Sequence, residues 1–187
     1  MSLIQDYGLE SPSRASLILT LSLEDRNRKK EMDKIHIHKV ILYFQHLRQT
    51  EEIDFSFFNL GGVSFELADD LETLTDCGLI EERHGQYILT DEGQKAAEQL
   101  GKRQADEDFK KLFFAKQQLN DLSLDELMYF MYKTIPQTQE QSTEFARLDG
   151  KKQSLIRSLF LKGRISTKTA AMWLGISERE FLSVLSR

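Results

Sequence analysis

The chain has little of the residues that interrupt regular structure or form covalent cross-links. Its 187 residues include one cysteine, two prolines and ten glycines. The single cysteine, Cys77, excludes an intramolecular disulfide framework and fits a reducing compartment. So little proline and glycine disfavours collagen-like chains and loop-dominated all-β architectures.

Long hydrophobic runs are also lacking. The longest apolar stretch, residues 17–23, is interrupted by Thr20 and Ser22, and it is far shorter than the roughly 20 residues that cross a bilayer. The first residues show no basic segment followed by an apolar one, so we expect no secretory signal. Hydrophobic residues make up 40% of the chain and charged residues 29%, enough for a real core. We therefore expect a soluble cytoplasmic protein with no membrane partner.

Charge is unevenly distributed along the chain. The net charge is −5 overall, yet residues 150–187 carry eight Lys and Arg against two Glu. The rest of the chain is correspondingly acidic. A basic end on an acidic body indicates two modules with different partners, and the alternative is a solvated surface that is merely uneven.

Hydrophobic periodicity and turn residues predict a mainly helical chain. The expected elements are a helix after Pro12, a helix over 35–47, a short strand over 53–58, a helix over 64–77, a hairpin around His84-Gly85, and helices over 90–100, 106–120 and 123–135. Three helices followed by a hairpin and a helix are typical of a winged helix. Residues 12–136 are the predicted winged-helix domain.

The C-terminal part is predicted to be a separate module. Residues 137–143 are polar and lack aliphatic side chains, so 137–148 is the predicted linker. Three helix candidates follow, at 152–161, 167–174 and 178–185, and Gly175 lies in the turn between the last two. We expect Leu174, Ile176, Phe181 and Val184 to be buried between these helices. The predicted fold is a mainly α winged-helix domain with a small β-hairpin, plus a helix-turn-helix module over 149–187.

The segment from Lys162 to Leu182 contains Gly-x-Ile-Ser, Ala-Ala, Leu-Gly-Ile-Ser and Glu-Phe in that order. This pattern resembles a family of small prokaryotic proteins treated as antitoxin-like, in which the same helix-turn-helix recurs. The likeness covers about residues 160–185. It implies a regulator of antitoxin type, and DNA is the partner that we expect for the module.

The second helix of a helix-turn-helix enters the major groove of DNA through its N-terminal residues. Arg179 is the candidate for a base contact, because arginine pairs with guanine through two hydrogen bonds. Cations just before that helix are the candidates for phosphate contacts. The predicted DNA-binding residues are Lys162, Arg164, Lys168, Ser177, Arg179 and Ser183. The alternative is that the module packs or dimerises without DNA.

The helix over 64–77 is the reading helix of the predicted winged helix, but it carries five carboxylates and no Lys or Arg. Phosphate would repel it, so we expect it to bind a basic protein partner instead. The predicted protein-binding residues are Glu66, Asp69, Asp70, Glu72 and Asp76.

The surrounding stretch also carries a resemblance. An aromatic strand, then Gly61-Gly62-Val63-Ser64, then a helix ending before Gly78-Leu79-Ile80 looks like Panacea-domain proteins and their relatives, which include antitoxins. Those proteins have Gly-Pro-Tyr-Ser where this chain has Gly-Gly-Val-Ser. The resemblance extends over about residues 12–136 and implies a winged-helix-like fold.

Catalytic and metal-binding patterns are not found in the sequence. His36 and His38 lie on one face only if their segment is a strand, because on a helix they point about 200° apart. No cluster of Cys, His or Asp completes a site with them, and Cys77 lacks a basic setting that would make it a nucleophile. We expect no enzyme activity, no metal and no cofactor. The competing hypothesis to a DNA-associated regulator is a protein that only binds protein or forms a homodimer.

Overall fold

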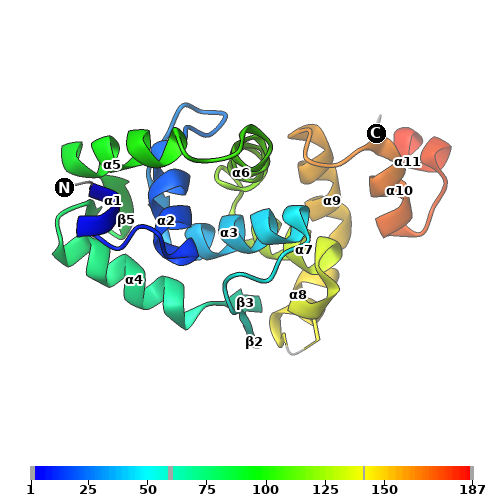
Figure 1. Cartoon of the computed structure of the whole chain (residues 1–187). Coiled ribbons are helices and arrows are strands. Elements are labelled where there is room, and N and C mark those ends of the chain that lie inside the picture. The colour runs from blue at the N-terminus through cyan, green and yellow to red at the C-terminus, as the bar shows by residue number, and fades with distance from the viewer. Residues whose placement is uncertain (1–2, 59–60, 141, 186–187) are drawn as a thin grey trace. The chain divides into compact units, whose positions relative to one another are not determined.

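The computed structural model describes residues 3–58, 61–140 and 142–185 and is mainly helical (Figure 1). In chain order the elements are α1 Leu3–Asp6, α2 Pro12–Ser22, β1 Met32–Asp33, α3 Lys34–Arg48, β2 Ser56–Phe58, β3 Gly61–Val63, α4 Phe65–Asp76, β4 Ile80–Arg83, β5 Gln86–Leu89, α5 Asp91–Gly101, α6 Asp106–Leu119, α7 Leu124–Thr134, the 3-10 helix η1 Pro136–Thr138, α8 Glu144–Asp149, α9 Lys152–Leu161, α10 Thr167–Leu174 and α11 Glu178–Leu185. Within these residues, none of the helices has the length and apolar character needed to span a membrane.

Helices α2, α3 and α4 and a three-stranded sheet form a winged helix. The sheet has the order β1-β5-β4 and is antiparallel, with Met32 opposite Tyr87 and Ile80 opposite Leu89. The hairpin between β4 and β5 turns at His84 and Gly85, which both have positive φ, as a two-residue type I′ turn requires. The predicted fold class, mainly α with a small β-hairpin, is confirmed.

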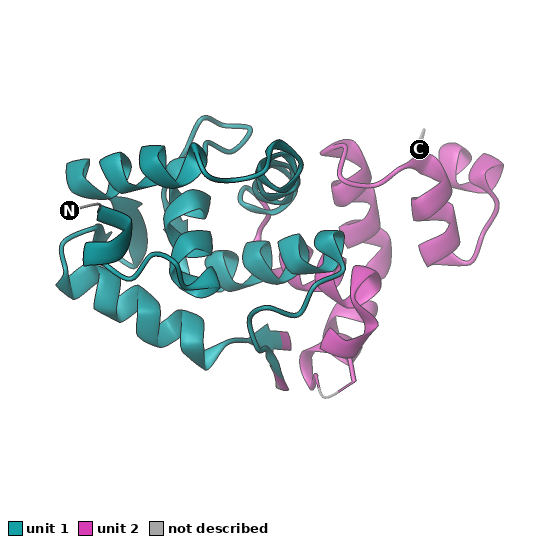
Figure 2. Ribbon diagram, viewed as in Figure 1, with its two compact units in different colours: residues 1–56, 62–121 teal, residues 57–61, 122–187 magenta. Residues whose placement is uncertain are grey.

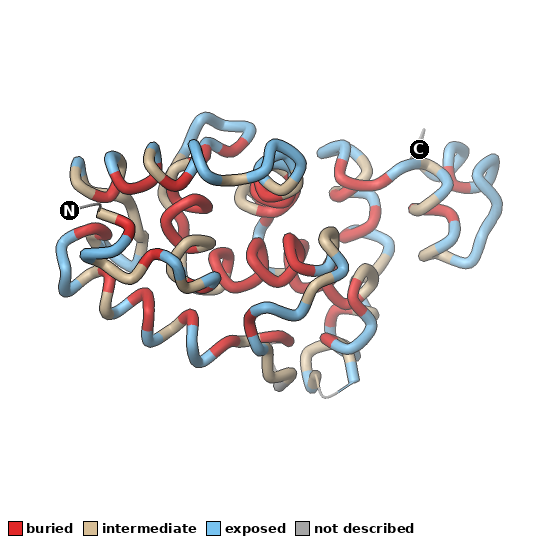
Figure 3. The backbone as a smooth tube through the Cα atoms, viewed as in Figure 1, coloured by how far each residue is buried: buried red, intermediate tan, exposed pale blue. Residues whose placement is uncertain are grey.

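Local signals place the helices of this domain. The Ser64 hydroxyl caps α4 by accepting a hydrogen bond from the backbone N–H of Leu67, and Thr90 caps α5 in the same way through Gly93. Leu67, Leu71 and Leu74 form the buried stripe of α4. Buried residues lie along one side of α4 and α5, whereas residues 36–45 of α3 are buried on all sides (Figure 3).

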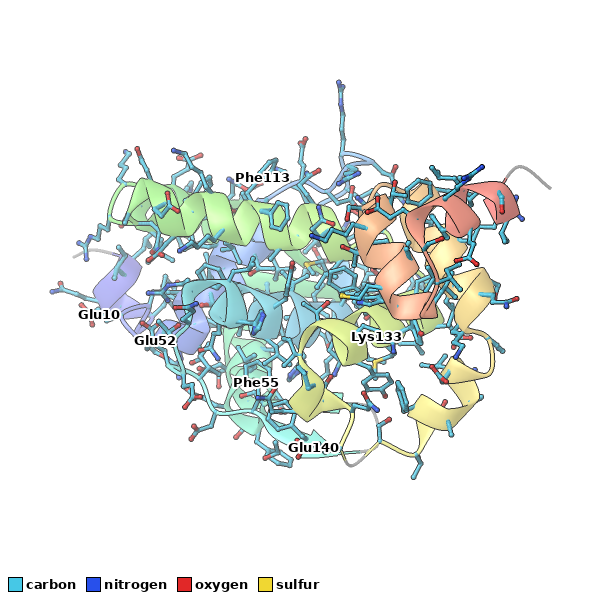
Figure 4. All side chains as sticks on the ribbon, turned by 90° about the vertical axis from the view of Figure 1, so that its right-hand side faces the viewer. Glu10, Glu52, Phe55, Phe113, Lys133 and Glu140 are labelled. Carbon is cyan, nitrogen blue, oxygen red and sulfur yellow. The ribbon has the colours of Figure 1, made fainter. Side chains whose placement is uncertain are left out.

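The chain divides into two compact units, residues 1–56 with 62–121, and residues 57–61 with 122–187 (Figure 2). This division differs from the predicted boundary at 137–148. Helix α7 packs on α8 and α9, so it belongs with the C-terminal helices. Lys133 lies on α7 (Figure 4), and its ammonium is 5.6 Å from the ring centroid of Tyr129 and 5.8 Å from that of Phe145.

The predicted linker is structured in its described residues, 137–140 and 142–148, and Gln141 lies outside the described residues. It overlaps η1 and α8, and Thr138 is 1% exposed, with its hydroxyl donating to the carbonyl of Ile135 at 2.7 Å. The hydroxyls of Tyr132 and Ser142 are 2.5 Å apart. The polar composition of this segment is typical of a linker. Its structure depends on hydrogen bonds, and hydrophobic patterning does not reveal these.

The last three helices form the predicted helix-turn-helix. The Ser166 hydroxyl caps α10 through the N–H of Thr169, and Gly175 ends this helix with a φ of 71°. Ala170, Ala171 and Phe181 are buried, and the Phe181 ring meets the Phe160 ring edge-on at 5.1 Å. The expectation that Ile176 and Val184 are buried here is wrong, because they are 36% and 56% exposed.

Candidate nucleic-acid interface

The N-terminus of α10 is a surface that suits an anion. Its first turn contains no acidic residue, Ser166 and Lys168 are exposed, and Thr167 and Thr169 are partly exposed. The first backbone N–H groups of a helix lack intrahelical acceptors, and the helix dipole favours negative charge at that end. The Ser166 hydroxyl already accepts from the N–H of Thr169, so the remaining donors at this end are the N–H groups of Thr167 and Lys168 and the Lys168 ammonium, a set of the kind that binds phosphate.

Helix α11 presents two different faces. At about 100° per residue, Arg179 and Ser183 lie within about 40° of each other on one side, and Phe181, Val184 and Leu185 lie about 100–160° away from them. Arg179 and Ser183 are both exposed. The predicted base-reading residues therefore share the outward face of the second helix of the motif.

Ser177 has a structural role at the start of α11. Its hydroxyl accepts a hydrogen bond from the N–H of Glu180 and donates one to the Glu180 carboxylate at 2.6 Å, and its own N–H donates to the same carboxylate. The Ser177 hydroxyl lowers the pKa of Glu180, so this side chain stays ionised and bound to the cap. Ser177 is therefore exposed but already engaged in a capping box.

The cations before α10 are placed differently from each other. The Lys162 ammonium lies 2.7 Å from the Glu126 carboxylate, and the Lys162 side chain is 37% exposed. Arg164 is only 7% exposed, next to buried Ile165. Arg164 was predicted to contact phosphate. Because its side chain is buried, it is not one of the exposed cations of the module. Sequence alone suggested a surface position because arginine is rarely buried.

Helix α4 carries an exposed acidic row. Glu66, Asp69, Glu72 and Asp76 follow each other at three- and four-residue intervals, so they share one face, and all four are exposed. The fifth predicted member, Asp70, is 8% exposed and does not belong to this surface. Its carboxylate accepts from Arg14 Nε at 2.7 Å and from the Ser13 hydroxyl, which ties α4 to α2.

Neutralising Asp70 is expected to destabilise the first unit, whereas neutralising its neighbour Asp69 is not. The Asp70→Asn variant loses the ion pair with partly buried Arg14, which we expect to lower the free energy of unfolding by about 2 kcal/mol. Asp69→Asn changes an exposed carboxylate and is expected to stay within about 0.5 kcal/mol of wild type. Urea unfolding followed by circular dichroism measures both. Equal losses in the two variants would contradict the structural role of Asp70.

The histidines are arranged as on a helix. His38 is 3% exposed, its Nδ1 accepts from the N–H of Ser64 at 3.2 Å, and burial lowers its pKa to about 4. His36 Nδ1 instead lies 2.8 Å from the Asp33 carboxylate. In the described part of the chain, no group of three or more His, Cys, Asp or Glu is arranged to hold a metal ion.

Sequence reasoning missed a groove of about 540 Å³ in the second unit. It is lined by Lys152, Gln153, Ser154, Arg157, Ser158, Leu161, Leu174, Ile176, Phe181, Val184 and Leu185. The signal in the sequence was the apolar pair Leu161 and Val184, of which Val184 was expected to be buried and Leu161 was given only as the end of a helix. In the structure they are 68% and 56% exposed.

Comparison with known proteins adds no family to this description. No protein-family model, no curated protein and no solved structure matches the chain.

Proposed function

We propose that this chain is a non-catalytic regulatory protein that attaches to DNA through its C-terminal helix-turn-helix. The observation that carries the proposal is the placement of Lys168 and Arg179. Lys168 lies at the exposed, acid-free N-terminus of α10, and Arg179 lies on the outward face of α11. In this motif the first helix crosses the DNA backbone and the second reads base edges, so each cation has the position that its role requires.

The acidic row on α4 supports the same division of labour. Four exposed carboxylates disfavour binding to the phosphates of DNA. Protein side chains release the counterions of DNA only where the side chains are cationic. This helix instead suits a basic protein partner. A protein that joins DNA to a second protein is a regulator of antitoxin or transcription-factor type, and we place it in the cytoplasm with its DNA.

The mutational test is the salt dependence of DNA binding by the full chain. We expect Lys168→Ala to weaken binding to all duplexes alike and to reduce the slope of log K against log salt by about one unit. Arg179→Ala is expected to lower discrimination between sequences by about 1–3 kcal/mol. Fluorescence anisotropy with labelled duplexes measures both effects. The control is Lys95→Ala, which removes an exposed lysine from α5 in the first unit.

If Lys95→Ala changes the slope as much as Lys168→Ala, the binding is unspecific attraction and the helix-turn-helix is not the DNA surface. If the full chain binds no duplex at about 50 mM salt, where counterion release favours binding most, the proposal fails.

A second candidate function, protein binding without DNA, is favoured by the exposed apolar side chains of the module. Leu161, Met172, Leu182 and Val184 are each more than half exposed. A surface of this kind often marks a protein contact. The two candidates are separated by the DNA titration above.

A further inference from the structure

The groove in the second unit is a slot between α9 and α11. Its lining residues on α9 run from Lys152 to Leu161, over the whole helix. At 1.5 Å per residue that is about 15 Å, or nearly three turns. Phe181, which is 2% exposed, belongs to the core beneath it, and Leu161, Ile176 and Val184 remain exposed around it.

The charged residues that line the groove are all basic. They are Lys152 and Arg157, both on α9, and no carboxylate is among the described residues that line it. The Lys152 ammonium is 3.8 Å from Asp149, a long and weak ion pair. Arg157 is exposed. The slot thus combines an apolar surface with positive charge along α9.

We propose that this groove binds an amphipathic helix with an acidic flank from a partner protein. Such a helix places apolar side chains at i, i+3, i+4 and i+7 into a groove of this length, which is a recurrent mode of recognition. Its carboxylates meet Lys152 and Arg157, and this charge complementarity selects acidic partners over basic ones.

The groove and the proposed DNA surface are on different sides of α11. Val184 and Leu185 line the groove, whereas Arg179 lies about 120–140° and Ser183 about 100–160° from them around the helix. A bound helix therefore leaves Arg179 accessible. This inference extends beyond the proposed function, since the helix site exists whether or not DNA binds on the opposite face.

The test uses the full chain and two labelled peptides. Both are designed amphipathic helices with leucine at i, i+3, i+4 and i+7, one with glutamate on the flanks and one with lysine at the same positions. By fluorescence anisotropy we expect the glutamate peptide to bind at least about tenfold more tightly than the lysine peptide, with a preference that weakens as salt rises. Arg157→Glu is expected to abolish or reverse that preference.

Leu182 and Val184 provide a matched pair of variants. They are 51% and 56% exposed on the same helix, but only Val184 lines the groove. We expect Val184→Glu to weaken binding of the glutamate peptide at least about tenfold and Leu182→Glu to change it less than about twofold. Because both residues are exposed, both variants are expected to keep the wild-type circular dichroism spectrum.

Three results would overturn the proposal. The first is no binding of the glutamate peptide at concentrations up to about 1 mM. A dissociation constant of that size corresponds to a binding free energy of about −4 kcal/mol. The second is equal weakening by Val184→Glu and Leu182→Glu, or no preference between the two peptides. The third is a concentration-dependent dimer in sedimentation that Val184→Glu abolishes, which would show that a second copy of the chain occupies the groove. Failure here leaves the DNA titration unaffected, so the two proposals fail separately.

Discussion

Gly93→Ala is expected to destabilise the first unit by about 3 kcal/mol or more. Gly93 lies in the first turn of α5, and a Cβ added there would be 2.0 Å from the carbonyl oxygen of Leu79 and 3.2 Å from the Leu89 side chain. The Leu79 carbonyl cannot simply move away, because it accepts a hydrogen bond from the N–H of Thr90 at 3.1 Å. The start of α5 would have to separate from the hairpin.

Gly101 is the matched control at the other end of α5. A Cβ at Gly101 meets no atom within 4 Å, so Gly101→Ala is expected to be neutral or to stabilise the helix by up to about 1 kcal/mol. Urea midpoints by circular dichroism compare the two variants. A Gly93→Ala midpoint equal to that of Gly101→Ala would show that α5 does not approach the hairpin as closely as described.

Lys116→Ala is expected to have a comparably large effect, about 4 kcal/mol. The side chain is fully buried on α6, and its ammonium donates to the carbonyls of Thr20 at 2.9 Å and Lys30 at 2.8 Å. It thus links α6 to α2 and to the loop before β1. The alanine variant leaves a cavity and two carbonyls without this donor. Lys116→Met fills the space without donating, so we expect it to cost less than alanine.

Lys116 also makes the stability of the first unit depend on pH. Burial lowers the pKa of Lys116 from an ordinary value of 10.5 to about 7. The negative charges of Asp25 and Glu31 raise this pKa and so offset part of the effect of burial. Between about pH 7 and 10.5 the unfolded chain binds the proton that the folded chain has lost, so stability rises with pH, by at most about 1.4 kcal/mol per pH unit. Burial also lowers the pKa of Lys39, to about 8, which adds a rise of the same sign.

The check is the urea midpoint at pH 7 and pH 9.5 in wild type and Lys116→Met. The wild-type midpoint is expected to rise, and the variant should retain only the smaller rise due to Lys39. If both proteins show the same rise, Lys116 does not titrate in this range in the folded state.

Local features of the fold were predictable from the sequence because their causes are local. Ser64, Thr90, Ser123 and Ser166 cap the predicted helices through N–H groups three residues away, and His84-Gly85 forms the expected turn. These signals depend on neighbours within one turn of chain, which a single sequence displays.

Features that depend on distant partners were not predictable. Asp70 was assigned to an acidic surface, yet its ion-pair partner Arg14 is 56 positions away in the sequence. Arg164 was expected at the surface but is buried, and Val184 was expected in the core but is exposed. Periodicity tells which residues share a helix face, but the neighbour that covers that face comes from tertiary packing. The candidate site therefore keeps Lys168 and Arg179 and loses Arg164.

The central claim is that DNA contacts the helix-turn-helix and not the acidic winged helix. The most direct test is to titrate the ¹⁵N-labelled full chain with duplex DNA and to follow the amide chemical shifts. The salt concentration is about 50 mM, where binding is favoured. We predict that the amides of Ser166–Thr169 and those around Arg179 and Ser183 shift, while those around Glu66, Asp69 and Glu72 on α4 do not. Shifts confined to α4 and the β4–β5 hairpin, or no shifts at all, would contradict the claim.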